Sequence, residues 1–148
     1  MKLVLIVGSP RSGTTWLQKM LASHSAFSTT QETYLFSGYL NSLNKYWEKE
    51  INRNDNRGVG ITHLIDRSDF IELNKTFALS VLKKIKKTSK SEFIIEKTPN
   101  NALVLDFIIE MFPNVHVIHL VRDPRSVAAS LISASKGWGE TLGTQQLD

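Results

Sequence analysis

Apolar and polar positions along the chain predict strands and helices that follow one another in turn. Leu3–Val7 is a continuous apolar run, typical of a strand buried on both faces, and Phe93–Ile95 is a second buried strand. Val115–Val121, in which two histidines interrupt the apolar residues, is the third predicted strand. A segment with helical spacing follows each run: Thr14–Ser23, Asn100–Met111, and Pro124 to about Ser135. This repetition favours an α/β fold with three layers, a parallel sheet with helices on both faces.

The stretch between the first two of these strands is expected to be mostly helical. Phe27–Thr30 is a short β-like segment, Tyr34–Glu50 has helical spacing, and Asn52–Gly60 is polar and aperiodic, as a loop is. A second helix is expected to begin at Asp69, with Glu72 as its capping-box partner. Its apolar face would comprise Phe70, Leu73, Phe77, Val81, Leu82 and Ile85.

Composition narrows the class of protein. The chain has 148 residues, which favours a single domain, 1–148. It has no cysteine, which excludes disulfides, cysteine-ligated metals and a thiol nucleophile. No apolar run reaches the length of a membrane span, and the apolar start is too short for a signal peptide, so a cytoplasmic protein is expected.

The net charge of +4 is mild and would suit an anionic ligand. Lysines are concentrated in the segment Lys83–Lys90, which reads as a solvated helix end or as a nucleic-acid patch. No aromatic residue is interleaved with these lysines, so the stacking half of a nucleic-acid site is missing. We therefore expect no nucleic-acid partner.

The first candidate site is the loop Gly8–Thr15, which lies between a strand and a helix start. It follows the phosphate-loop pattern in both glycines and in Thr15, but Thr14 stands where that pattern has lysine. Glycines allow a tight turn, and successive N–H groups and the helix N-terminus attract anions. A phosphate-like or sulfate-like group is therefore expected on Arg11, Ser12, Gly13, Thr14 and Thr15, in a P-loop NTPase-like fold.

The missing lysine argues against ordinary phosphoryl transfer. That chemistry normally uses the loop lysine and a Mg²⁺ held by a strand-end aspartate. Asp123 ends a strand, but Pro124 follows it, so a helix N-cap explains Asp123 better than a magnesium ligand does. No metal site is expected.

Three motifs resemble those of sulfotransferases that use 3'-phosphoadenosine-5'-phosphosulfate (PAPS). Gly8–Leu17 (GSPRSGTTWL) resembles the 5'-phosphosulfate loop of that family, Val121–Ser130 (VRDPRSVAAS) its 3'-phosphate motif, and Glu96–Pro99 (EKTP) the strand-end segment between them. The spelling of the loop is most similar to the bacterial and tyrosylprotein branch. The resemblance implies a sulfotransferase with PAPS as co-substrate, 3'-phosphoadenosine-5'-phosphate (PAP) as product, and no metal.

The resemblance also assigns residue roles. Arg11 to Thr15 would hold the 5'-phosphosulfate, and Arg122 and Ser130 would hold the 3'-phosphate. Ala134 stands where the tyrosylprotein branch tends to have a further basic residue. Arg11 and Lys97 would stabilise the charge that develops on the leaving oxygen.

The catalytic base is expected to be Glu32. In the cytosolic branch a histidine follows the Lys-Thr pair, but Pro99 occupies that place here. Thr30–Thr33 (TQET) resembles the segment that carries a catalytic glutamate in the tyrosylprotein and glycosaminoglycan branches. The alternatives are that Glu32 caps the helix that follows, or that His63 is the base.

The acceptor would be a hydroxyl or amine of a small molecule, a carbohydrate or a peptide, and the oligomeric state stays open. Tyr34, Phe36, Tyr39 and Trp47 would line its pocket or belong to the core. Two other functions stay open: a nucleotide or small-molecule kinase of the P-loop class, and a non-catalytic PAP-binding module. Members of the family are usually longer, so the chain is expected to be a fragment lacking a C-terminal portion, or a reduced member.

Overall fold

A parallel sheet forms the centre of the protein. The computed structural model describes residues 1–53, 59–86 and 91–142. Within them four strands pair in the order β2-β3-β1-β4, all parallel: β1 (Lys2–Gly8), β2 (Phe27–Thr29), β3 (Phe93–Glu96) and β4 (His116–Leu120). Strand β1 lies between β3 and β4 and pairs with both, so that Leu5 is beside Glu96 on one side and Val117 on the other. The expected parallel α/β sheet is confirmed.

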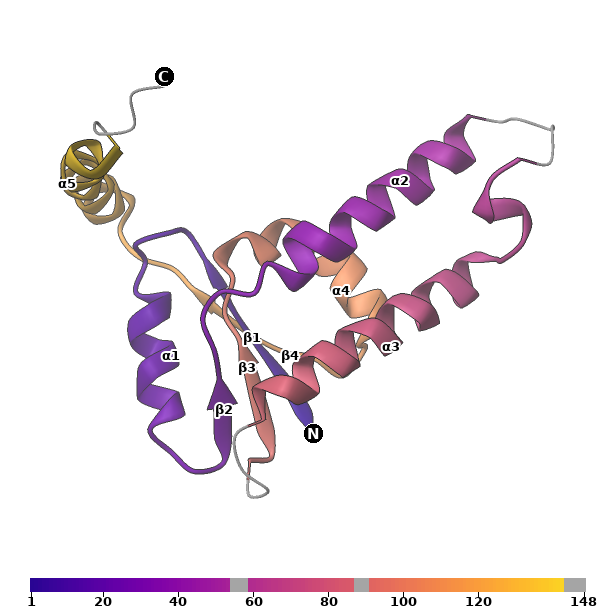
Figure 1. Ribbon diagram of the computed structural model, residues 1–148. Helices are drawn as coiled ribbons and strands as arrows, with labels where there is room; N and C mark the ends of the chain where they lie inside the picture. Colours follow the sequence, from indigo (N-terminus) through magenta and orange to yellow (C-terminus); the bar gives the residue numbers. More distant parts are fainter. Residues whose placement is uncertain (54–58, 87–90, 143–148) are drawn as a thin grey trace.

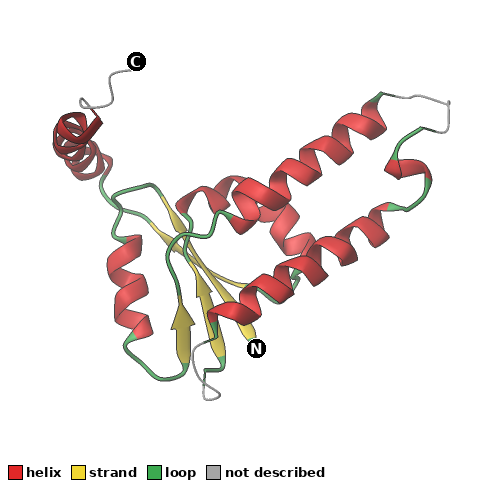
Figure 2. Cartoon of the chain, viewed as in Figure 1, coloured by secondary structure: helices red, strands yellow, loops and turns green. Residues whose placement is uncertain are grey.

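Helices connect the strands and cover the sheet (Figures 1 and 2). The α-helices are α1 (Thr14–Ala22), α2 (Asn41–Asn52), α3 (Arg67–Ile85), α4 (Leu105–Met111) and α5 (Pro124–Leu142). Shorter turns precede three of them: the π-helical η1 (Leu35–Leu40) and the 3-10 turns η2 (Ile61–His63) and η3 (Pro99–Val104). The segments Tyr34–Glu50 and Asn100–Met111 were each predicted as a single helix. The first begins as a π-helix and the second as a 3-10 helix before each becomes an α-helix.

Side chains of β1 alternate between two cores. Leu3, Leu5 and Val7 pack with residues of α2, α3 and α4, whereas Val4 and Ile6 pack on the opposite face with residues of β3 and α1. All five are buried, because a strand in the middle of a parallel sheet is covered on both faces. The three-layer arrangement with helices on both faces is confirmed, and Figure 2 shows the strands between the two groups of helices.

Helix α3 begins earlier than the sequence pattern predicted. Asp66 is the N-cap: its side chain accepts the Asp69 N–H at 2.9 Å, and the Asp69 carboxylate accepts the Asp66 N–H at 3.2 Å. The prediction of Asp69 as the cap with Glu72 as its partner was wrong. Asp69 occupies the N3 position of this capping box, where glutamate or glutamine is usual. Glu72 forms an ion pair with Lys75 at 3.2 Å instead.

The buried row of α3 also differs from the predicted face. It comprises Phe70, Asn74, Ala78, Leu82 and Ile85, whereas Leu73 is 60% exposed and Phe77 51% exposed. Asn74 is tolerated inside because its Nδ2 donates to the Phe70 carbonyl at 2.7 Å.

The end of α3 and the chain beyond β4 are more exposed. Lys83 and Lys84 lie exposed in the last turn of α3, as a solvated helix end predicts; residues 87–90 of the same lysine-rich segment lie outside the described residues. Helix α5 leaves the β4 edge of the sheet (Figure 1), and Val127 is buried in its first turns. No helix among the described ranges is long and apolar enough to cross a membrane.

Candidate active site

A cavity of about 520 Å³ lies at the carboxyl ends of the strands. Because the described strands are parallel, Gly8, Thr29, Glu96 and Leu120 all end at this one edge, where open α/β sheets bind ligands. The volume is within the range of small-molecule sites. The cavity is lined by Pro10, Arg11, Gly13, Thr14, Thr15, Glu32, Tyr34, Thr98, Pro99, Asn100, Arg122 and Ser130.

Two glycines shape the loop between β1 and α1. Gly8 has φ +151°, and a Cβ on it would lie 2.6 Å from the Leu120 carbonyl oxygen, so the backbone of β4 leaves no room for a side chain. Gly13 is the N-cap of α1 with φ +105°, a conformation that side-chain-bearing residues rarely adopt. The loop therefore needs glycine at both positions of the phosphate-loop pattern.

The start of α1 offers donors to an anion. No side chain caps the helix at Gly13, so its first backbone N–H groups have no capping acceptor. The hydroxyl of Ser12 is buried and, within the described part of the chain, has no hydrogen-bond partner. An anion with several acceptor oxygens fits these donors and the positive end of the helix.

Arg11 and Arg122 link this loop to the β4–α5 connection. Arg11 has φ +71° and its Nε donates to Ser130 Oγ at 3.0 Å, while Arg122 Nη1 donates to the Arg11 carbonyl at 3.1 Å. The two motifs that the resemblance assigned to opposite ends of one nucleotide thus meet at the same edge of the sheet.

Glu32 and Lys97 form an ion pair beside the loop. Lys97 Nζ lies 2.5 Å from Glu32 Oε1, and the lysine is 5% exposed whereas the glutamate is 32% exposed. The Tyr34 hydroxyl is hydrogen-bonded to Glu32, and that bond and the negative charge of the carboxylate raise the pKa of Tyr34 above its usual value. The predicted base and the predicted stabilising cation are therefore in direct contact.

A sequence model of the "Sulfotransferase family" matches residues 4–148. This chain belongs to the Sulfotransferase family. Among curated proteins it is 32% identical over 136 residues to a protein-tyrosine sulfotransferase of Drosophila melanogaster and 31% identical over 136 residues to protein-tyrosine sulfotransferase 1 of Mus musculus. It is 28% identical over 134 residues to nodulation protein NoeE of Sinorhizobium fredii (strain NBRC 101917 / NGR234).

These alignments cover nearly all of the chain but a small part of each relative. Each spans 90% of this sulfotransferase-family chain, against 26% of the Drosophila protein, 34% of the mouse protein and 31% of NoeE. The chain therefore spans about a quarter to a third of the length of the curated relatives it matches.

The residues to which the family resemblance assigned roles lie in or beside the cleft of this sulfotransferase-family chain. Seven line the cavity: Arg11, Gly13, Thr14, Thr15, Glu32, Arg122 and Ser130. Ser12 lies buried in the loop. Lys97 is not a lining residue, but it is paired with Glu32, which is. The motifs, although spread over 120 residues of chain, converge because the strands that precede three of them are parallel neighbours.

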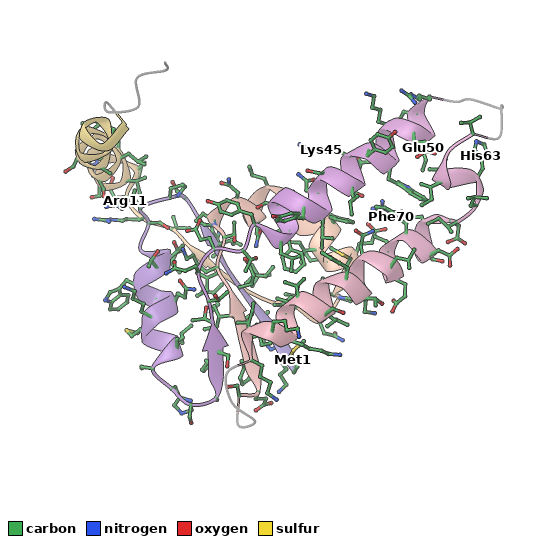
Figure 3. The ribbon with its side chains drawn as sticks, viewed as in Figure 1. Met1, Arg11, Lys45, Glu50, His63 and Phe70 are labelled. Carbon is green, nitrogen blue, oxygen red and sulfur yellow. The ribbon has the colours of Figure 1, made fainter. Side chains whose placement is uncertain are left out.

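Other candidates lie elsewhere. His63 is in η2, in the connection between α2 and α3, on the opposite side of the molecule from Arg11 (Figure 3). Phe36 and Trp47 are core residues with stacked or edge-on aromatic neighbours. Tyr39 is exposed and is not among the residues that line the cavity, whereas Tyr34 is exposed and lines it. Asp123 accepts the Arg125 N–H at 2.9 Å, as a helix cap does. Among the described residues no group of acidic or histidine side chains could hold a metal ion.

Two contributors to the cleft were not evident from the sequence. One is the bond between Tyr34 and Glu32, and the other is Glu96, a buried carboxylate at the end of β3. Thr98 precedes Pro99 at the start of η3, but its hydroxyl donates to Glu96 at 2.6 Å and makes no cap bond. Contacts between residues more than 60 positions apart, such as Thr33 with Glu96, leave no local signal in a single sequence.

Proposed function

We propose that this chain is the donor-binding part of a sulfotransferase that moves the sulfuryl group of PAPS to a hydroxyl or amine acceptor. The observation that carries the proposal is the juxtaposition, in one cavity, of an anion-binding loop, a second basic position and a carboxylate–ammonium pair. Membership in the family supports the same chemistry.

The donor side of the cavity consists of the loop and the β4–α5 connection. The uncapped N–H groups of α1, the Ser12 hydroxyl and Arg11 would hold the 5'-phosphosulfate, and Arg122 with Ser130 the 3'-phosphate. When bound, PAPS supplies the sulfuryl group, and PAP is the product that remains. A guanidinium recognises phosphate by two parallel hydrogen bonds, which suits both arginines to this role.

The transfer side consists of Glu32 and Lys97. The Glu32 carboxylate would accept the proton that the acceptor hydroxyl or amine gives up, which is typically worth about 10²–10⁴ in rate. Lys97 Nζ, already beside Glu32, would donate to the oxygen on which negative charge develops, and one preorganised donor of this kind is worth about 2.7–4 kcal/mol. Lys97 is nearly inaccessible to solvent, so water screens its charge little.

The acceptor enters from the exposed side of the same cavity. Tyr34 lines the cavity and is half exposed, so its ring would contact the acceptor next to Glu32. A tyrosine-containing peptide is one acceptor to test, because two of the relatives are named protein-tyrosine sulfotransferases. Carbohydrate and small-molecule alcohols and amines are the others.

A transfer assay tests the proposal. The purified chain is incubated with sulfur-labelled PAPS and a tyrosine peptide, an oligosaccharide or a small alcohol, and labelled product and released PAP are measured together. Acceptor-dependent release of PAP with label in the product is the expected result. Tight PAP binding with no transfer to any acceptor would favour the binding-module alternative, and phosphoryl transfer from ATP–Mg²⁺ would favour a kinase.

A further inference from the structure

We propose that Glu96 is a positioning residue, which holds Glu32 against Lys97 by anchoring Thr33. Resting on the proposed function, this inference adds a residue to which neither the sequence motifs nor the family resemblance gave a role. Glu96 is not itself in contact with the cavity; its effect passes through the segment that carries Glu32.

Glu96 is a buried carboxylate held by neutral donors. It is 1% exposed, and its Oε1 accepts the hydroxyls of Thr33 at 2.8 Å and Thr98 at 2.6 Å, while its Oε2 accepts the amide of Asn101. Burying a carboxylate is costly unless its oxygens are hydrogen-bonded. Within the described structure these donors are all uncharged, so the hydrogen bonds they give are what offsets the cost of burying this carboxylate.

Two of these donors pass the constraint on to the next element. Thr33 Oγ1 also accepts the Leu35 N–H at 3.1 Å, and Asn101 Oδ1 accepts the Ser37 N–H at 3.2 Å. Both N–H groups belong to the start of η1, where backbone donors lack partners within the helix. Glu96 therefore fixes the beginning of η1 to the end of β3.

Two neighbouring residues at the end of β3 therefore hold two neighbouring residues of the segment before η1. Glu96 binds Thr33 and Lys97 binds Glu32, while Tyr34 continues the chain with φ +51°, a strained conformation for a tyrosine. The bond between Lys97 and Glu32 joins two long side chains, which on their own could reorient together. The bond between Thr33 and Glu96 fixes the backbone next to Glu32. The Glu32 carboxylate therefore contacts Lys97 and Tyr34 in one orientation.

The decisive variant is Thr33→Val, which keeps the shape of the side chain and removes its hydroxyl. Thr33→Ser restores the hydroxyl and should restore function. Thr29→Val is the matched control: the Thr29 hydroxyl also donates to β3, to the Ile95 carbonyl at 3.0 Å, but among the described residues the side chains that donate to Glu96 are those of Thr33, Thr98 and Asn101. Glu96→Gln is the second test, because it keeps the size and replaces an acceptor oxygen with an NH₂ donor.

Four quantities are measured on the 148-residue chain: kcat, KM for PAPS, the affinity for PAP, and the pKa of Tyr34. The pKa is followed by NMR with ring-labelled tyrosine, assigned with Tyr34→Phe. Thr33→Val and Glu96→Gln should lower kcat about 10²-fold, the size expected of a 1 Å misplacement. KM for PAPS and PAP affinity should change less than 3-fold, and the pKa of Tyr34 should fall toward its usual value. Thr33→Ser and Thr29→Val should remain near wild type.

The Tyr34 pKa decides the proposal even where turnover is too slow to measure. A raised pKa that persists in Thr33→Val, or a kcat loss no larger than that of Thr29→Val, would overturn the positioning role. Failure of the wild-type chain to bind PAP would instead count against the proposed function, and the two failures are therefore distinguishable.

Discussion

Arg11 Nε donates a hydrogen bond to Ser130 Oγ at 3.0 Å, although 119 residues separate them along the chain. Arg122 strengthens the same junction by donating to the Arg11 carbonyl at 3.1 Å. The residues proposed for the two ends of the donor nucleotide are thus in contact and line one cavity.

The first prediction concerns the 3'-phosphate. Arg122→Ala should weaken PAP binding by about 10–100-fold, the size of a lost charge-assisted hydrogen bond. It should weaken adenosine-5'-phosphosulfate binding much less, because that ligand has no 3'-phosphate. Isothermal titration calorimetry of both ligands measures the difference.

Arg125→Ala is the matched control for this experiment. Arg125 is an exposed arginine three positions later, paired with Asp123 at 2.8 Å and absent from the cavity lining. Its removal lowers the net charge equally and should leave both affinities unchanged. Equal losses for the two ligands in Arg122→Ala would contradict the 3'-phosphate assignment.

The second prediction concerns the base. Glu32→Ala and Glu32→Gln should lower kcat by about 10²–10⁴-fold, because neither side chain can accept the acceptor's proton, and PAP should still bind. Steady-state kinetics with the acceptor identified in the transfer assay, together with PAP titrations, measure both effects. Glu72→Gln serves as the control, because Glu72 is an exposed carboxylate on α3. Full activity in Glu32→Gln would remove Glu32 from the mechanism.

The third prediction concerns Tyr34. The carboxylate of Glu32 raises the pKa of this phenol above its usual value of 10.0. The stabilising contribution of their bond is therefore complete below about pH 10 and is lost as the pH rises through the raised pKa.

Tyrosine titration and thermal melts across alkaline pH check this prediction. Glu32→Gln should return the pKa of Tyr34 to the usual range, and Tyr34→Phe should flatten the alkaline loss of melting temperature. A titration of Tyr34 that is the same with and without the Glu32 carboxylate would be inconsistent with the bond.

The fourth prediction concerns the loop. Gly8→Ala places a Cβ 2.6 Å from the Leu120 carbonyl oxygen at φ +151°, so backbone must move, whereas a Cβ at Gly13 meets its nearest neighbour at 3.7 Å and incurs strain from φ alone. Gly8→Ala should therefore destabilise the chain more than Gly13→Ala, by more than about 1 kcal/mol. Urea unfolding measures both, and the reverse order would contradict the loop geometry.

The sheet and the cleft were largely predictable from local patterns. Continuous apolar runs marked the buried strands, and parallel pairing required the motifs after Val7 and Ile95 to share an edge with Arg122. The phosphate-loop pattern predicted the loop, whereas the roles of Lys97 and Arg122 followed from the resemblance to sulfotransferases.

What the sequence did not predict depends on contacts between distant residues. Asp66 rather than Asp69 caps α3, since either aspartate fits the local pattern and the fold selects between them. Leu73 and Phe77 are exposed because the core lies on the side of Asn74 and Ala78. Nothing near Glu96 in the sequence indicates Thr33 as its partner.

The most direct test of the account is a binding comparison of PAP, AMP and ATP–Mg²⁺ by thermal shift. A cavity that holds both phosphates of the donor predicts that PAP raises the melting temperature well above the other two ligands at equal concentration. The Arg122→Ala variant should reduce the PAP shift to that of AMP. A larger shift with ATP–Mg²⁺, or no shift with PAP, would contradict the central claim that this cleft binds the PAPS nucleotide.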